Sequence, residues 1–239
     1  MATFVLVHGA GTGGWLWDDV ADLLRAAGHQ VAAPSLLGVG DQSAEDVTLT
    51  THINQVVQLV QHEHADPVIL VGFSYGGLVV AGAADRLSAQ VSRLIYLEAF
   101  LPTPGRSFLD LLPDAARTAM QQAADTFGDG QRIPPAPVEM VGGIGALEPG
   151  VRPEHVHAVL RRRGFQPMGT YTEPFPSRPD AALLPAMFIS CTDKPDGDPL
   201  LAVADRVLAQ GWTVHQLATG HFAMVTMPQA LTLLLAAEG

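Results

Sequence analysis

The chain has 239 residues, of which 48% are apolar, and its 24 acidic residues outnumber its 13 lysines and arginines. This length and composition suit one large α/β domain, or two small ones, with a substantial hydrophobic core. The formal net charge of −11 argues against nucleic acid and anionic membranes as partners, because both are themselves negatively charged.

The sequence also predicts a cytoplasmic location. No apolar run reaches the roughly 18 residues that a membrane-spanning helix needs. The N-terminal stretch MATFVLVHGAG lacks the positively charged start and the small-residue cleavage site of a signal peptide. Cys191 is the single cysteine, so an intramolecular disulfide is impossible, which fits a reducing compartment.

The first hundred residues alternate short apolar runs with helical patterns. Continuous apolar runs predict strands that are buried on both faces, and the helices between them predict a parallel sheet. In chain order we expect a strand at 3–7, a helix at 15–27, a strand at 30–34, a helix at 50–64, a strand at 67–73, a helix at 75–89 and a strand at 92–100.

This alternation stops between about Leu101 and Leu184, where most of the prolines lie and only 107–124 and 152–163 have helical patterns. We interpret the chain as one domain, 1–239, with a core of 1–103 and 184–239 and a cap inserted at about 104–183. A separate domain at 101–184 is the weaker alternative, because that segment has too little regular apolar pattern for a core of its own. After the cap we expect a strand at 186–190, a helix at 199–210, a strand at 212–217 and a helix at 224–237.

Ser74 is the first candidate catalytic residue. It lies in VILVGFSYGG, where a predicted strand runs into a G-x-S-x-G turn and then into a predicted helix. This turn projects a serine hydroxyl into a pocket and aims a helix N-terminus at the same place. A serine that merely caps the following helix is the alternative, but the strand, turn and helix occur in the order that a nucleophile needs.

A serine nucleophile needs a base, usually a histidine that a carboxylate orients. His221 is the predicted base, since it follows the last predicted strand and precedes the final helix. Asp193 is the favoured acid, because it is the first carboxylate after the strand before that. Asp196 and Glu98 remain alternatives, the latter because it ends the fourth strand and can face the same histidine.

The oxyanion that forms during acyl transfer needs hydrogen-bond donors already in place. The glycine-rich loop VHGAGTGGW begins where the first strand ends, and we expect the backbone N–H groups of Ala10 and Tyr75 to be these donors. Nucleotide binding is excluded, because the chain has no G-x-x-x-x-G-K-[ST] and GAGTGG does not fit G-x-G-x-x-G followed by an acid.

Together, HGAGTGGWLW, GFSYGG, CTDK and TGHFAM resemble the α/β-hydrolase fold over the whole chain. More narrowly, they resemble plant methylesterases of the salicylate-binding type and hydroxynitrile lyases, with their bacterial carboxylesterase relatives. The resemblance implies a mostly parallel sheet of eight strands, of which the first are absent here, a Ser-His-Asp site and no cofactor. CTDK favours Asp193 as the acid.

Two positions depart from the lyases of this group. Those enzymes generally have a lysine directly after the active-site histidine and a threonine after the histidine of the HG loop. Here the two positions are Phe222 and Gly9. No cation therefore stands beside His221 in the sequence to hold cyanide, and the pattern favours an esterase.

We therefore predict a cofactor-free serine esterase, a monomer or homodimer, that hydrolyses a small or aromatic ester and binds neither nucleic acid nor a membrane. A lyase, or a ligand-binding receptor on the same fold, is the alternative. The expected pocket lining is Gly9, Phe100, Leu101, Met168, Phe222 and Met224.

Overall fold

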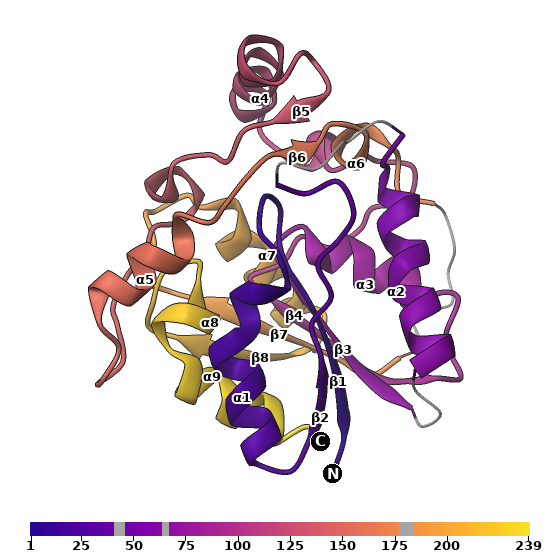
Figure 1. The fold of residues 1–239 in the computed structure, drawn as a ribbon, viewed down its shortest axis with the longest axis vertical. Coiled ribbons are helices and arrows are strands. Elements are labelled where there is room, and N and C mark those ends of the chain that lie inside the picture. Colours follow the sequence, from indigo (N-terminus) through magenta and orange to yellow (C-terminus); the bar gives the residue numbers. More distant parts are fainter. Residues whose placement is uncertain (41–45, 64–66, 177–183) are drawn as a thin grey trace.

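The computed structural model describes residues 1–40, 46–63, 67–176 and 184–239, and it places a twisted sheet between two layers of helices (Figure 1). In the described residues the main sheet has six strands in the order β2-β1-β3-β4-β7-β8, and every neighbouring pair is parallel. This confirms the predicted α/β class. The strands are β1 (Thr3–Val7), β2 (Gln30–Ala32), β3 (Val68–Phe73), β4 (Val91–Leu97), β7 (Ala186–Cys191) and β8 (Thr213–Leu217).

Each face of the sheet is covered by helices that bury an apolar side. On one face α2 (Leu49–Glu63), α3 (Gly76–Ala84) and α7 (Pro199–Ala209) contribute to one hydrophobic core. On the other face α1 (Asp18–Ala26), α8 (Ala223–Thr226) and α9 (Pro228–Ala236) contribute to a second core. The long apolar strands of the sequence are explained by this double covering.

Two predicted helices of the core are divided in the structure. The helix expected at 15–27 begins with a short 3-10 turn, η1 (Gly14–Trp17), before α1. The last helix is split into α8 and α9, and Pro228 is the first residue of α9. Proline has no N–H to continue α8 but suits the first turn of a new helix, which explains the division.

The segment between β4 and β7 lies over the carboxyl ends of the strands, with α4 protruding at the top of Figure 1. The helical pattern at 107–124 is divided by Pro113 into a 3-10 turn and α4. Residues 177–183 of the predicted cap lie outside the described residues, and the domain boundaries stay our interpretation. The elements are η2 (Leu109–Leu111), α4 (Asp114–Phe127), β5 (Arg132–Ile133), η3 (Val138–Val141), α5 (Pro153–Leu160), β6 (Gln166–Pro167) and α6 (Gly169–Thr172).

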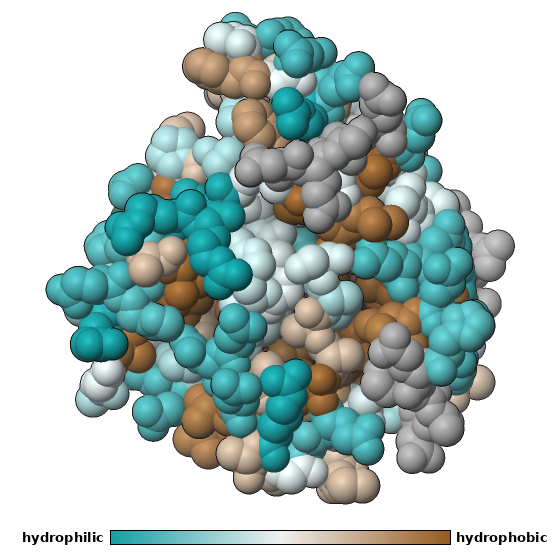
Figure 2. All heavy atoms as spheres, viewed as in Figure 1, coloured by the Kyte–Doolittle hydropathy of each residue, from teal (hydrophilic) through white to brown (hydrophobic). Residues whose placement is uncertain are grey.

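Strand β2 forms one edge of the main sheet and has only three residues. The Arg25 guanidinium donates to the carbonyl of Val31, a residue of β2, at 3.1 Å. On the face shown in Figure 2, apolar side chains form separate groups among polar ones. Within the described ranges, no helix is long and apolar enough to cross a bilayer.

Candidate active site

The register of β1 and β3 brings two predicted site residues together. These strands are neighbours, and Val7 pairs with Gly72. Gly9 and Ser74 each follow two residues later, so they leave the sheet side by side. A Cβ added to Gly9 would lie only 3.0 Å from the Cβ of Ser74. The chain reverses its strand order around β1, and ligands of parallel α/β sheets bind at such a switch point.

The turn around Ser74 has the backbone that a nucleophile needs. Ser74 has a positive φ of 52°, in a region that few non-glycine residues adopt, and its side chain is half-buried. A Cβ on Gly76 would lie 2.7 Å from the carbonyl oxygen of His8, and one on Gly72 would lie 2.7 Å from that of Gly76. Only glycine fits at both positions, which explains the G-x-S-x-G spacing.

His221 lies against the residue that precedes Ser74. Its ring centroid is 4.6 Å from that of Phe73, and Phe222 packs against both rings. The imidazole is 6% exposed, and the His221 amide donates to the carbonyl of Gly143 in the cap segment at 3.1 Å. Packing and backbone contacts therefore hold the predicted base beside the predicted nucleophile.

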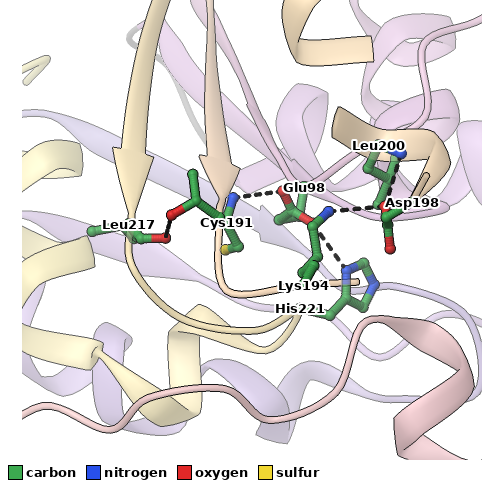
Figure 3. A network of polar contacts seen from close by, with 8 residues as sticks. Glu98, Cys191, Lys194, Asp198, Leu200, Leu217 and His221 are labelled. Atoms are coloured by element: carbon green, nitrogen blue, oxygen red, sulfur yellow. Dashed lines mark hydrogen bonds and ion pairs between the residues drawn. The ribbon is translucent and has the colours of Figure 1, made fainter. Parts of the chain in front are cut away.

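The carboxylate that faces His221 belongs to Glu98. Its Oε2 lies 3.4 Å from His221 Nδ1, and its Oε1 accepts from the Cys191 amide at 2.6 Å (Figure 3). Glu98 follows Leu97, which pairs with Phe73 across β3 and β4, so Glu98 and Ser74 leave the sheet at the same level. The end of the fourth strand, one of the two alternatives in the sequence, thus supplies this carboxylate.

Asp193 does not occupy the place that we expected. Its side chain is exposed, and its Oδ2 accepts from the Ala146 amide of the cap segment at 2.8 Å. Asp193 lies two residues beyond the end of β7, and its own amide is bonded to the Thr219 carbonyl, so the side chain faces the cap. Asp196 is also exposed. The prediction that Asp193 orients His221 is therefore corrected.

Lys194 is a site residue that the sequence reasoning missed. Its side chain is 0% exposed, and its Nζ donates to Glu98 Oε2 at 2.7 Å and to Asp198 Oδ1 at 2.9 Å. Asp198 Oδ1 also accepts from the Leu200 amide, so Asp198 is the N-cap of the helix that follows. Lys194, the lysine of CTDK, is thus ion-paired with Glu98 at the end of β4.

The HG loop is held by a buried, neutral histidine. His8 Nε2 accepts from the Leu36 amide at 2.9 Å, so its proton is on Nδ1, which donates to the Gly9 carbonyl at 2.7 Å. Burial lowers the pKa of His8 to about 4. From the cap, Gln166 Oε1 accepts from the Gly11 amide at 2.9 Å. The loop that carries Ala10 is therefore held by hydrogen bonds on its core side and on its cap side.

A second buried histidine fixes Tyr75, the residue after the predicted nucleophile. His52 Nε2 donates to the Leu37 carbonyl at 2.8 Å, so Nδ1 accepts from the Tyr75 hydroxyl at 3.0 Å. Burial lowers the pKa of His52 to about 4. The Tyr75 amide lies just before α3, where N–H groups lack partners within the helix.

These two histidines predict a loss of stability in acid. Each is neutral in the folded chain above about pH 4, whereas in the unfolded chain it takes up a proton below about 6.5. The contribution of the two neutral histidines to the free energy of unfolding is complete above pH 6.5. It is lost as the pH falls towards 4, at roughly 1.4 kcal/mol per pH unit for each histidine. We expect the free energy of unfolding, measured with urea at pH 7 and pH 5, to fall less between these two values in His52→Gln than in the wild type. The exposed His157→Gln is the control, and an equal decline in both variants would contradict this account.

The cap segment is tied to the core at several separate places. The Gly164 amide donates to the Gly11 carbonyl at 2.8 Å, and the Gly220 amide donates to the Ile144 carbonyl at 3.0 Å. Glu148 accepts from two amides at the start of α9, and His155 Nε2 lies 2.8 Å from Asp19 Oδ2. The cap therefore contacts the HG loop and the loop that carries His221.

The residues predicted to line the pocket are dispersed in the structure. Gly9 and Phe222 lie beside Ser74 and His221, as described above. The Phe100 amide donates to the Ser74 carbonyl at 3.2 Å, and its ring packs on Phe108. Leu101 lines a groove of about 740 Å³ with Tyr96 and Trp212, and Met168 lines a cavity of about 330 Å³ with Gln131; neither is lined by Ser74 or His221. Met224 is fully buried in the second core.

Comparison with known proteins agrees with the observed fold. Residues 4–232 match the model of the alpha/beta hydrolase family. The chain belongs to this family. It is 35% identical to a carbendazim hydrolyzing esterase of Nocardioides sp. (strain SG-4G), and the match covers 100% of both chains. An alpha-hydroxynitrile lyase of Arabidopsis thaliana is 39% identical, but over only 41% of this chain and 40% of the lyase.

Solved structures show the same fold at lower identity. An extracellular alpha/beta-hydrolase from a Paenibacillus species has a TM-score of 0.85 and 21% identity, and the match covers 100% of this chain and 99% of that one. A pyrethroid hydrolase from Sphingobium faniae JZ-2 has a TM-score of 0.73 and 24% identity, over 99% and 96%. These structures show the fold, whereas the full-length match to an esterase and the family match support a carboxylic ester hydrolase of the alpha/beta hydrolase family.

Among the described residues, no group of three or more His, Cys, Asp or Glu side chains is placed to hold a metal ion. Lys194 and Asp198 are engaged with Glu98 and with the start of α7, as described above.

Proposed function

We propose that this chain is a serine carboxylic ester hydrolase with Ser74 as nucleophile, His221 as base and Glu98 as the acid that orients the base. The proposal rests on two contacts of the His221 side chain, one with Phe73 and one with Glu98. Its ring packs on Phe73, next to Ser74, while its Nδ1 faces Glu98 Oε2 at 3.4 Å. The ends of two neighbouring strands, β3 and β4, and the loop after β8 thus supply the three groups.

In the proposed reaction, Ser74 Oγ attacks the ester carbonyl while His221 Nε2 accepts its proton. The amides of Ala10 and Tyr75 donate to the oxyanion, and the proton on His221 then passes to the leaving alkoxide. Water, activated by the same histidine, releases the acyl group from Ser74. The buried negative charge of Glu98 stabilises the imidazolium in both steps.

We propose a small or aromatic ester as the substrate. The rings of Phe73 and Phe222 lie beside His221, and the Tyr75 ring packs on Phe108 and Tyr171. Aromatic side chains favour contact with flat apolar groups. The relative from Nocardioides is named for hydrolysing carbendazim, so this compound belongs in the first panel of substrates beside aryl and methyl esters.

A lyase reaction with the same residues is the second candidate, because a named hydroxynitrile lyase is among the relatives. Cyanide release needs a cation near the leaving group. Lys194 is a cation close to His221 in space, but it lies on the Nδ1 side and is bound by two carboxylates. Phe222 occupies the position after His221 and is buried against its ring.

We therefore expect ester hydrolysis without cyanohydrin cleavage. The measurement is a parallel assay of p-nitrophenyl acetate hydrolysis and mandelonitrile cleavage on one preparation, with Ser74→Ala as the control for both. Cyanide release that disappears in Ser74→Ala, with no ester hydrolysis, would establish the lyase instead. A ligand-binding receptor on this fold would show neither activity above the Ser74→Ala control.

A further inference from the structure

The Glu98 oxygen that faces His221 is shared with a buried cation. Glu98 Oε2 lies 3.4 Å from His221 Nδ1 and accepts from Lys194 Nζ at 2.7 Å (Figure 3). Lys194 also donates to Asp198 Oδ1 at 2.9 Å, and Asp198 is fixed at the start of α7 by the Leu200 amide. Lys194 thus connects the Glu98 carboxylate to the N-terminus of α7.

The cap segment excludes water from this cluster. A Cβ added to Gly142 would lie 3.1 Å from Lys194 Cδ, 3.2 Å from His221 Cβ and 3.5 Å from Asp198 Oδ2. The Glu98 and Lys194 side chains are both 0% exposed. Burying a lysine removes its hydration, which is costly unless both geometry and partners compensate. Its charge also acts strongly on its neighbours, because little water screens it.

The charges around His221 come from three elements. The end of β4 contributes Glu98, the loop after β7 contributes Lys194 and Asp198, and the cap contributes Arg163, whose guanidinium lies 5.7 Å from the centre of the Phe222 ring. Cys191 is near the cluster too, but burial raises the pKa of its thiol, so it is neutral. On the Nδ1 side, one positive and two negative charges therefore face the imidazole.

From this arrangement we propose that Lys194 is a positioning residue of the site, which rests on the proposed function above. It holds the Glu98 carboxylate against His221 Nδ1 and offsets part of the negative charge there. Asp198 acts in the opposite direction, because its charge favours the protonated imidazole.

The test is the pH dependence of kcat/KM for p-nitrophenyl acetate. In Lys194→Met two buried negative charges remain, so we expect the acid limb of the profile to move up by roughly one pH unit. In Asp198→Asn one positive and one negative charge remain, so the limb should move down. Asparagine also caps helices well, which preserves the start of α7.

The opposite displacement of the two variants separates this role from packing alone. A residue that only packs would lower kcat without moving the acid limb, and unmoved limbs in both variants would overturn the proposal. Should Lys194→Met fail to fold, the Asp198→Asn profile decides in the same way. Failure of the proposed function is distinct, because Ser74→Ala would then retain ester hydrolysis in the wild-type background.

Discussion

Ser74→Ala is expected to lower kcat for aryl acetate hydrolysis by about 10⁶-fold, because the nucleophile of an acyl-transfer site has no substitute. The hydroxyl is half-buried at a turn and outside the two hydrophobic cores, so the variant should still fold. Activity and thermal unfolding are measured on the same sample. Retention of more than about a tenth of the wild-type rate would exclude Ser74 as the nucleophile, given that expected loss.

Ser74→Gly is the matched control for the backbone. Ser74 has a φ of 52°, which is costly for serine and alanine but not for glycine. The glycine variant should be as inactive as the alanine variant but more stable, by about 1 kcal/mol. A glycine variant that is no more stable than the alanine variant would show that the turn is not strained.

Glu98→Gln is expected to reduce kcat by about 10⁴-fold, the loss seen when an amide replaces the acid of a Ser-His-acid site. Glutamine can still accept from the Cys191 amide, but its neutral side chain neither stabilises the imidazolium nor fixes the tautomer of His221. The shape of the side chain is kept, but the variant should be less stable than the wild type because the buried Lys194 loses one of its two carboxylate partners. Thermal unfolding of the variant checks this point.

Asp193→Asn provides the comparison. This side chain binds the Ala146 amide in the cap segment, and an asparagine oxygen can accept from the same amide. The loss of kcat should therefore be within about tenfold, far below the loss expected for Glu98→Gln. If the two losses were reversed in rank, the acid would be Asp193, as the sequence pattern alone suggested.

The fold could be predicted largely from the sequence because its strands are long, apolar and separated by helices. Ser74 and His221 can be named as candidates from the sequence, since each lies at a junction between elements that the pattern defines. The acid was harder to assign, because several carboxylates follow strand ends and contacts across the sheet decide among them. Glu98 stands in the apolar stretch LIYLEAF, and a buried carboxylate needs a polar partner. This need is the signal in the sequence that points to Glu98.

Lys194 and the cap contacts could not have been predicted in the same way. Lys194 pairs with a residue 96 positions away, and nothing in its local sequence indicates that its side chain is buried. Gln166 reaches Gly11 over 155 positions. Such contacts depend on how the cap lies on the core, and the cap has little periodicity from which to infer its path.

The short edge strand β2 also has a consequence for how these molecules behave together. An exposed strand offers unpaired N–H and C=O groups to a strand from another molecule, which is a common route to aggregation. Here that edge has only three residues, Arg25 occupies the Val31 carbonyl, and Pro34 soon follows without an N–H to donate. This edge therefore gives an incoming strand very few positions for hydrogen bonding, which disfavours intermolecular sheet growth from β2 in concentrated preparations.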